Sequence, residues 1–419
     1  MSPDESYALE LDAADPLAGF RDQFHVPSQP DGSPAIYLCG NSLGLQPKAA
    51  RVLVEKELDD WAALGVAGHF KPDSPWYSYH ELFHESGARL VGARPGEVVM
   101  MNSLTVNLHL MMVTFYRPTR DRYKVLIDAP AFPSDSYAVQ SQVRHHGYEP
   151  GDAIIVVGPR AGEHVLRIED VEETLDRHGH EIALVWWNAV NYYSGQYHDV
   201  GRIVAAALRN GCIVGFDLAH AAGNVALHLH DWQVDFAVWC NYKYVNAGPG
   251  AVAGCFVHEK HGHDLDLPRF AGWWGNDPAT RFRMHLEPRF TPRPGADGWQ
   301  VSNPPIFSMV PLRASLDLFD RAGMTALRAK SERLTGYLEF LLDRRLGGRI
   351  EIVTPRDPDR RGCQLSIRVG DAAHERMRAL ESAGVVCDFR EPDVIRVAPV
   401  PLHNTFHEVW RFARVFSTV

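Results

Sequence analysis

The chain has 419 residues, of which 45% are hydrophobic and 22% are charged, an ordinary composition for a globular protein with more than one core. The formal net charge of −10 argues against a general nucleic-acid-binding protein, which would carry a basic face. No apolar run reaches membrane-spanning length and the acidic amino terminus has no signal-peptide pattern, so we expect a cytoplasmic protein with reduced cysteines and neither membrane nor nucleic acid as a partner.

The first sixty residues (1–60) are predicted to form an amino-terminal arm and a helix that pack with a smaller domain. The helix is expected over residues 47–64, where apolar residues recur at helical spacing. A proline near its start and Gly65 after its end are the residues that favour helix initiation and termination.

Residues 61–310 are predicted to form a large domain of the α/β class. Helices are expected over 134–146, 169–178 and 200–210. Strand-like runs occur at 97–101, 123–127, 153–157, 182–187, 212–216, 235–240 and 250–257. This alternation predicts a mainly parallel, seven-stranded sheet between helices. The last two strands follow each other without a helix, so we expect that pair to be antiparallel.

Residues 311–419 are predicted to form a small α+β carboxyl-terminal domain. One long helical region is expected over 312–345, and the domain boundary is placed inside it, near residue 310. Strands are then expected near 350–353, 363–369, 385–389 and 394–398, and helices near 371–383 and 404–416.

Two chemically distinctive side chains stand where predicted buried strands end. Asp217 ends the run GCIVGFD, and Lys243 follows the next strand in DFAVWCNYKYVNAGPG. In doubly wound sheets, ligands bind at this edge. Asp217 alone could simply cap the next helix. A lysine between two tyrosines and before a glycine-rich turn, however, is not expected to be an ordinary solvated charge.

The two residues together match the requirements of pyridoxal phosphate. A lysine that loses its proton attacks the aldehyde of this cofactor and holds it as a Schiff base. A carboxylate beside the pyridinium nitrogen keeps the ring protonated, so that the ring accepts electrons from a substrate carbanion. We therefore predict that Lys243 carries the cofactor and that Asp217 pairs with its ring.

A longer series of motifs resembles kynureninase, a fold-type I pyridoxal-phosphate hydrolase related to class V aminotransferases. In chain order the motifs are GNSLGLQPK (40–48), LTVNLHL (104–110), AFPSDSYA (131–138), YYSGQ (192–196), FDLAHAAGN (216–224), GWWGND (272–277), SNPP (302–305) and IRVAPVPLHNTFHE (395–408). The resemblance implies hydrolysis of the Cβ–Cγ bond of L-kynurenine or 3-hydroxy-L-kynurenine, in tryptophan degradation or NAD precursor synthesis. The products would be anthranilate or 3-hydroxyanthranilate and L-alanine.

The resemblance also implies a role for each matching residue. Lys243 would move a proton at the α-carbon of the substrate, and Tyr242 would bind the phosphate and act as an acid in later steps. Contacts to the cofactor would come from Leu104, Thr105, Phe132, Pro133, Ser134, Asp135, Asn188, Asp217, His220, Tyr242, Lys243, Trp273 and Asn303. Contacts to the substrate would come from Arg396, which suits the α-carboxylate, and from Ser42, His69 and Asn303.

Two features of the resemblance concern assembly and substrate choice. Trp273 and Asn303 would reach in from a second subunit, which implies a homodimer with shared active sites. His69 and Asn303 are typical of members that prefer 3-hydroxykynurenine, so we hypothesise that preference. Asn188 stands where animal members have serine, and Trp274 replaces a phenylalanine.

Simpler interpretations stay open for single residues. Phe132 and Trp273 could be core aromatics, Thr105 a helix cap and Asn303 part of a turn. The histidines of HEKHGH (258–263) are spaced loosely like metal ligands, but we interpret this segment as a solvated surface loop and predict no metal site.

Other functions also stay open. The chain could be a different fold-type I enzyme, such as a cysteine desulfurase or a class V aminotransferase. It could hydrolyse another ring-substituted kynurenine in a secondary-metabolite pathway, or bind the cofactor without catalysis. A desulfurase would need a mobile catalytic cysteine, and none of the six cysteines lies in an obvious exposed glycine-rich loop.

Overall fold

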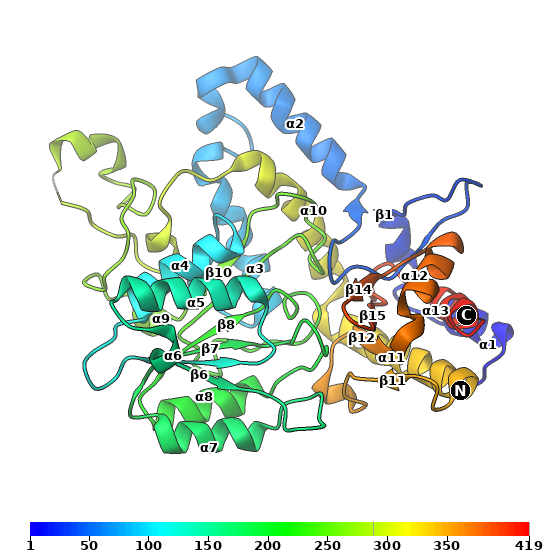
Figure 1. Cartoon of the computed structure of the whole chain (residues 1–419). Helices are drawn as coiled ribbons and strands as arrows, with labels where there is room; N and C mark the ends of the chain where they lie inside the picture. Colours follow the sequence, from blue (N-terminus) through cyan, green and yellow to red (C-terminus); the bar gives the residue numbers. More distant parts are fainter. Residues whose placement is uncertain (288, 419) are drawn as a thin grey trace.

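The computed structural model describes residues 1–287 and 289–418, which form a larger and a smaller lobe (Figure 1). The larger lobe contains a seven-stranded sheet with the strand order β4-β10-β9-β8-β7-β5-β6. Its strands are β4 (Val98–Met100), β5 (Lys124–Asp128), β6 (Ile154–Val157), β7 (Ile182–Asn188), β8 (Ile213–Asp217), β9 (Phe236–Trp239) and β10 (Gly254–Val257).

The pairing of these strands confirms the predicted sheet. Strands β6, β5, β7, β8 and β9 run parallel to one another. Strand β10 is antiparallel to β9, as predicted for the last pair, and also to β4 at the sheet edge. The carboxyl ends of the parallel strands therefore meet at one edge, where Asp217 is the last residue of β8.

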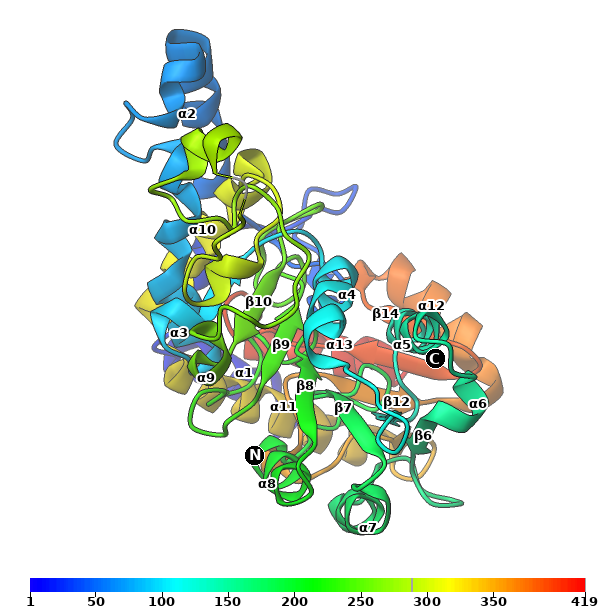
Figure 2. The ribbon, with the colours of Figure 1, turned by 90° about the vertical axis from the view of Figure 1, so that its left-hand side faces the viewer.

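Helices cover both faces of this sheet (Figure 2). Helices α7 (Ile168–His178) and α8 (Val200–Arg209) lie against one face, and α4 (Leu104–Phe115) and α5 (Pro133–His145) against the other. Neighbouring side chains of the fully buried β7 pack on opposite faces of the sheet. Trp187 belongs to the core with α7 and α8, and Trp186 belongs to the core with α4 and α5. This two-sided burial accounts for the continuous apolar sequence of the central strands. Shorter helices of this lobe are α3 (His84–Val91), α6 (Pro150–Ala153) and α9 (Glu259–Gly262).

The smaller lobe contains a four-stranded antiparallel sheet in the order β11-β12-β15-β14. Its strands are β11 (Glu351–Ile352), β12 (Leu365–Arg368), β14 (Asp388–Arg390) and β15 (Val394–Val397), and its helices are α11 (Met324–Leu346), α12 (Ala373–Ser382) and α13 (Phe406–Phe416). This arrangement agrees with the α+β pattern expected for the carboxyl-terminal part.

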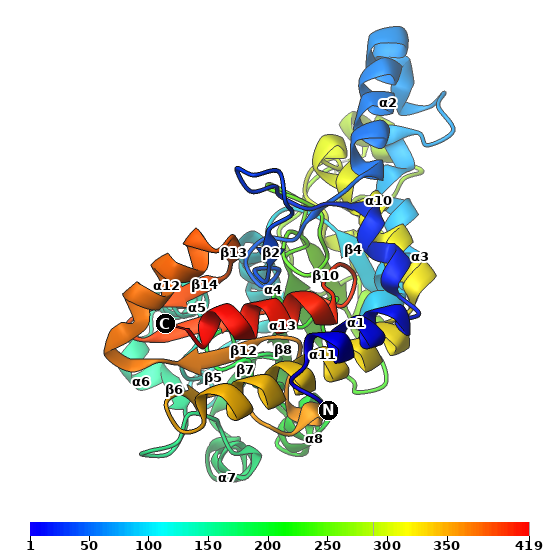
Figure 3. The ribbon, with the colours of Figure 1, turned by 90° about the vertical axis from the view of Figure 1, so that its right-hand side faces the viewer.

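The amino-terminal segment contacts both lobes. Helix α1 (Glu5–Ala13) lies beside α13 (Figure 3), where the carboxylate of Asp12 accepts hydrogen bonds from the amides of Phe406 and His407 at 2.6 and 3.0 Å. Strand β2 (Ile36–Tyr37) pairs in parallel with β13 (Val385–Val386), and β1 (Phe24–His25) pairs with β3 (Gln46–Pro47). Helix α2 (Ala49–Leu64) instead packs along α10 (Ile306–Ala322) and extends away from the body of the molecule.

The single long helix expected over 312–345 is wrong. The structure has two helices there, α10 and α11, separated by Gly323. Gly323 has a φ of +74°, a left-handed conformation that glycine adopts without strain and that ends α10. Side chains of α10 such as Leu312 and Phe319 belong to the core of the larger lobe, whereas α11 from Leu334 onward belongs to that of the smaller lobe. The domain boundary near residue 310 stays a prediction.

Within residues 1–287 and 289–418, no helix combines the length and the apolar character needed to cross a membrane.

Candidate active site

One cavity at the carboxyl ends of the sheet strands collects most of the predicted cofactor residues. It is lined by Leu104, Thr105, Phe132, Ser134, Asp135, Asn188, Tyr192, Asp217, Ala219, His220, Tyr242 and Lys243. Tyr192 and Ala219 were not assigned a role from the sequence, although both lie inside quoted motifs. The topology explains the gathering, because these residues follow β4, β5, β7, β8 and β9 at the same sheet edge.

Lys243 lies in the turn after β9, half-buried among polar and aromatic groups. Its Nζ is 3.1 Å from Nε2 of His220, and 5.8 and 5.9 Å from the ring centroids of Phe132 and Tyr242. Burial and the positive charges of Lys243 and Arg396 hold the pKa of His220 well below its ordinary value. His220 is therefore a neutral imidazole that accepts a hydrogen bond from the lysine.

Three carboxyl groups are buried close to one another, those of Asp217, Asp135 and Asp128, and Lys243 lies near the first of them. Asp217 Oδ1 accepts a hydrogen bond from the Ala219 amide at 2.6 Å, and burial raises the pKa of Asp217 while the charge of Lys243 opposes this. Burial and the neighbouring Asp217 and Asp128 raise the pKa of Asp135 well above its ordinary value. Asp135 Oδ1 has no hydrogen-bond partner among the described residues.

The third carboxyl group, Asp128, ends β5. Its oxygens accept hydrogen bonds from Asn188 Nδ2 at 2.8 Å and Asn191 Nδ2 at 3.3 Å. Burial nevertheless raises the pKa of Asp128 to about 6. Asn188 therefore lines the cavity and at the same time bonds the buried Asp128 carboxyl group.

The first turns of two helices, α4 and α5, also line the cavity. Helix α4 begins at Leu104 and has no side-chain cap, so the amides of its first turn are free to bind an anion. Helix α5 begins at Pro133, and the hydroxyl of Ser134 in its first turn lies 3.1 Å from that of Thr105 in α4. Amides and hydroxyls in this arrangement suit a phosphate group.

These observations fit the predicted pyridoxal phosphate. The buried carboxyl groups, with an unpartnered oxygen on Asp135, call for a cation such as a pyridinium nitrogen. The helix amino termini suit the phosphate, and Lys243 supplies an amine in the same cavity. Burial, with Cys240 and Asp217 nearby, raises the pKa of Tyr242, so its phenol stays protonated near neutral pH.

Arg396 approaches this cavity from the smaller lobe. It lies in β15 and is only 1% exposed. Its Nη1 donates to the carbonyl oxygen of Tyr192 at 2.6 Å, and the Tyr192 ring lies edge-on to Phe132 with centroids 5.3 Å apart. Tyr192 thus connects Arg396 to the cofactor cavity across the two lobes.

Five other predicted residues are not among the described residues that line the Lys243 cavity. One of them, Pro133, begins α5 between the lining residues Phe132 and Ser134. His69 lies beyond α2, in the short helix η2 (Gly65–His69), with its ring edge-on to Trp76. Trp273 is 37% exposed, and Ser42 and Asn303 are exposed. The segment of Ser42 nevertheless lies against the lysine turn, because the Gly44 amide donates to the Tyr242 carbonyl oxygen at 2.8 Å.

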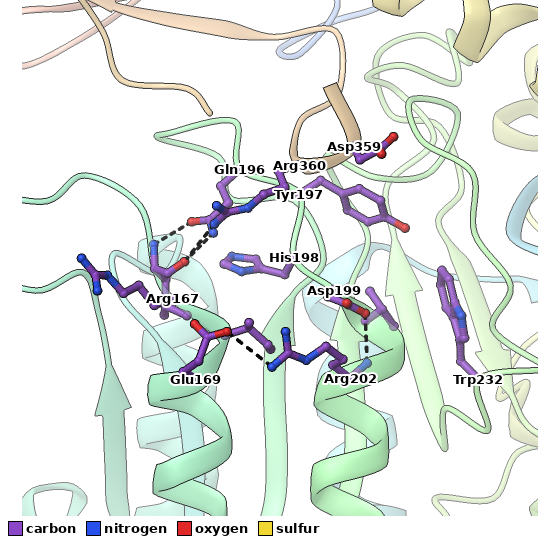
Figure 4. Close-up of a pocket in the computed structure, with 13 residues that line it drawn as sticks. Arg167, Glu169, Gln196, Tyr197, His198, Asp199, Arg202, Trp232, Asp359 and Arg360 are labelled. Carbon is purple, nitrogen blue, oxygen red and sulfur yellow. Dashed lines mark hydrogen bonds and ion pairs between the residues drawn. The ribbon is translucent and has the colours of Figure 1, made fainter. Parts of the chain in front are cut away.

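A separate hollow lies between the amino-terminal ends of α7 and α8 and residues 359–360 (Figure 4). Two of its basic side chains are already paired: Arg202 lies 2.6 Å from Glu172 and 3.4 Å from Glu169, and Arg167 pairs with Glu163. Its acidic Asp199 caps α8 by accepting from the Arg202 amide at 3.0 Å. These charged side chains are therefore already held by partners within the protein.

The interpretation of HEKHGH as a solvated loop is wrong for its first histidine. His258 is only 3% exposed, and its ring stacks on His230 at 4.8 Å. Glu97 lies beside both rings, so the three could in principle hold an ion. Their atoms, however, already bond to the protein: Glu97 Oε1 accepts from the Glu259 amide at 2.8 Å, and His258 Nδ1 accepts from the Lys260 amide at 3.1 Å.

Comparison with known proteins identifies close relatives along the whole chain. A family model described as the kynureninase C-terminal domain matches residues 327–416. The chain is 60% identical over 413 residues to a kynureninase of Myxococcus xanthus, covering 99% of this chain and 96% of that protein. It is 55% identical over 412 residues to a kynureninase of Koribacter versatilis, covering 98% and 97%.

Solved structures resemble the chain in fold. A mutant of C-DES with glycine covalently linked to its pyridoxal-phosphate cofactor superposes with a TM-score of 0.78 at 17% identity, covering 94% of this chain and 98% of that one. An apo cysteine desulfurase from Thermococcus onnurineus gives a TM-score of 0.73 at 17% identity, covering 92% and 94%. At these identities the likeness concerns the fold alone.

Proposed function

The chain belongs to the kynureninase family, and we propose how its own residues carry out the reaction of that family. It is a pyridoxal-phosphate-dependent hydrolase that cleaves the Cβ–Cγ bond of L-kynurenine, of 3-hydroxy-L-kynurenine or of both. The products are anthranilate or 3-hydroxyanthranilate and L-alanine. We place the reaction in tryptophan catabolism or NAD precursor synthesis, in the cytoplasm.

The single cavity that joins Lys243, Asp217 and the start of α4 carries our assignment of residues. When bound, pyridoxal phosphate supplies an electron sink for negative charge at the α-carbon of the substrate. We assign Lys243 as its covalent anchor and Asp217 as the partner of its ring nitrogen. The phosphate is assigned to the first turn of α4, at Leu104 and Thr105, with Ser134 and Tyr242 beside it. The remaining contacts to the ring are assigned to Phe132, Pro133, Asp135, Asn188 and His220.

The proton transfers are assigned to Lys243 and Tyr242. Lys243 is proposed to take the proton from the α-carbon, since it lines the cavity and its Nζ bonds a neutral His220. Water adds to the γ-ketone, and the aryl fragment leaves. Tyr242 is proposed to protonate the β-carbon of the alanine fragment, because its raised pKa keeps the phenolic proton in place until it is transferred.

Arg396 is proposed to bind the α-carboxylate of the substrate. It is buried at the junction of the lobes, and its contact with Tyr192 places it beside the cavity. A guanidinium binds a carboxylate through two parallel N–H groups, which fixes the orientation of the α-carbon next to Lys243. Ser42 is proposed to assist from the segment that bonds the Tyr242 carbonyl oxygen.

A homodimer is proposed to complete the site. Helix α2 extends from the body and carries exposed apolar side chains, with Val52 65% and Trp61 58% exposed, as expected of a surface that a second copy covers. Trp273 and Asn303 are also exposed outside the cavity of their own chain. We propose that both enter the site of the partner subunit. We also propose that His69 and Asn303 favour 3-hydroxykynurenine by forming a hydrogen bond with its ring hydroxyl.

The burial of the cysteines argues against a desulfurase despite the similar fold. Cys212, Cys240, Cys255 and Cys363 are buried, and Cys39 and Cys387 are only partly accessible. In the described chain no cysteine therefore lies on an exposed mobile loop of the kind a desulfurase uses. Release of fluorescent anthranilate from L-kynurenine by the purified holoenzyme, without any added keto acid, tests the hydrolase directly. A product that forms only when pyruvate is added would instead indicate an aminotransferase.

A further inference from the structure

Asp388 and Arg396 stand directly opposite each other on adjacent strands of the smaller lobe. Strand β14 is antiparallel to β15, and their register pairs Asp388 with Arg396. One carboxylate oxygen of Asp388 accepts from Arg396 Nε at 3.0 Å, and the other lies 2.7 Å from Nη2. This is a bidentate ion pair, which holds a guanidinium in one orientation.

A third contact fixes the guanidinium at its other side. Arg396 Nη1 donates to the carbonyl oxygen of Tyr192, a residue of the larger lobe that lines the Lys243 cavity. A guanidinium has five N–H donors, and these contacts use three of them. One N–H on Nη1 and one on Nη2 have no partner among the described residues. Such a pair of terminal donors can bind a second carboxylate through two parallel hydrogen bonds.

Charge and burial make the orientation of Arg396 depend on Asp388. The side chains are 1% and 10% exposed, so Arg396 would bear a large desolvation cost without a partner. Arg390 also donates to Asp388, at 3.3 Å. Two arginines and one aspartate leave one net positive charge, so the cluster still attracts an anion.

We propose that Asp388 is a positioning residue for recognition of the α-carboxylate. It holds the guanidinium of Arg396 by its Nε side, so that the two free terminal N–H groups are presented as a fixed pair. Asp388 does not itself contact the substrate. The inference rests on the proposed role of Arg396 and adds the group that makes that role specific for a carboxylate.

The test compares ligands with and without the carboxylate in Asp388→Asn holoenzyme. We expect KM for L-kynurenine to rise about tenfold or more while kcat changes less than about threefold, because the interaction serves binding. In absorbance titrations of the bound cofactor, the dissociation constant of L-alanine should rise about tenfold and that of L-alaninamide less than about twofold. Asp393→Asn is the matched control, since Asp393 pairs with the exposed Arg368 at 3.0 Å in the same lobe.

The other possible results contradict either the positioning role of Asp388 or the role of Arg396. Unchanged L-alanine affinity in Asp388→Asn, or equal losses for both ligands, overturns the positioning role. Arg396→Lys tests the underlying assignment separately: if it leaves L-alanine affinity unchanged, the carboxylate binds elsewhere and the role of Arg396 fails. If Asp388→Asn does not fold, Asp388→Glu keeps the ion pair but displaces the guanidinium by one methylene. Unchanged L-alanine affinity in that variant would equally overturn the proposal.

Discussion

The amine nitrogen of Lys243 lies 3.1 Å from Nε2 of His220. Burial and the nearby positive charges keep His220 neutral by lowering its pKa. The imidazole can therefore orient the lysine through a hydrogen bond without placing another charge beside Asp217. The position of the amine is thus set by a neutral acceptor.

Replacement of Lys243 should abolish cofactor attachment and activity together. We expect purified Lys243→Ala to lack the visible absorbance of the lysine-bound cofactor and to release no anthranilate from L-kynurenine. Lys243→Arg should fail in the same way, because a guanidinium keeps the charge but does not form a Schiff base. His220→Gln, which retains an acceptor, should keep the absorbance. A Lys243→Arg variant that retained the absorbance would place the anchor at another amine.

Asp217→Asn should lower kcat by about a hundredfold or more, because a neutral amide does not keep a pyridine nitrogen protonated. The measurement is steady-state anthranilate release by protein saturated with cofactor. Asp317→Asn is a suitable control, since Asp317 pairs with Arg321 on the exposed face of α10. Equal activity of the two variants would contradict the assignment of Asp217.

Asp128 should make the cofactor-free protein sensitive to pH. Burial raises the pKa of this carboxyl from 3.8 to about 6 in the folded chain, although Asn188 and Asn191 donate hydrogen bonds to it. Between pH 3.8 and about pH 6, the Asp128 carboxyl group keeps its proton in the folded protein but has lost it in the unfolded chain. The contribution of Asp128 to the unfolding free energy is therefore present below about pH 4 and is lost as the pH rises through about 6.

Asp128→Asn should remove this dependence. As the pH is raised from 4 to 7, the variant should become more stable relative to the native sequence by about 2–3 kcal/mol, because only the native protein loses the contribution of Asp128. Urea unfolding of the cofactor-free proteins at both pH values measures the difference. A difference that stays constant with pH would show that Asp128 does not titrate in this range.

The residues at the centre of the site could be predicted because each of them is marked by a local sequence pattern. Asp217 and Lys243 each follow an apolar run long enough to be a buried strand, and parallel strands bring their carboxyl ends to one sheet edge. Leu104 and Thr105, which the resemblance assigned to the cofactor, begin α4 after β4 of the same sheet. The inferences about Asp217 and Lys243 required only strand ends.

Features that depend on tertiary pairing were not predicted. The ion pair between Asp388 and Arg396 follows from the register of β14 and β15, which the sequence does not specify. The bond from Arg396 to the Tyr192 carbonyl oxygen joins residues from different lobes. His258 looked like a surface residue because its neighbours are charged, but contacts with Glu97 and His230 bury it.

His69→Phe should change substrate preference if the proposed ring-hydroxyl contact exists. We expect kcat/KM for 3-hydroxykynurenine to fall about tenfold while that for kynurenine changes little, because only the former loses a hydrogen bond. The ratio of the two kcat/KM values for the native sequence, measured at one pH, is the reference. An unaltered ratio, or a native preference for unsubstituted kynurenine, would contradict the proposal.

Shared active sites should be detectable by mixing two inactive variants. Lys243→Ala lacks the amine but retains Trp273. Trp273→Ala retains the amine but lacks the tryptophan side chain. In a mixed dimer with shared sites, one site combines both lesions and the other combines both native residues. Random exchange makes about half of the dimers mixed, so about a quarter of the native activity should return. If Trp273 instead served its own chain, every site in the mixture would keep one lesion, and no activity would return after subunit exchange.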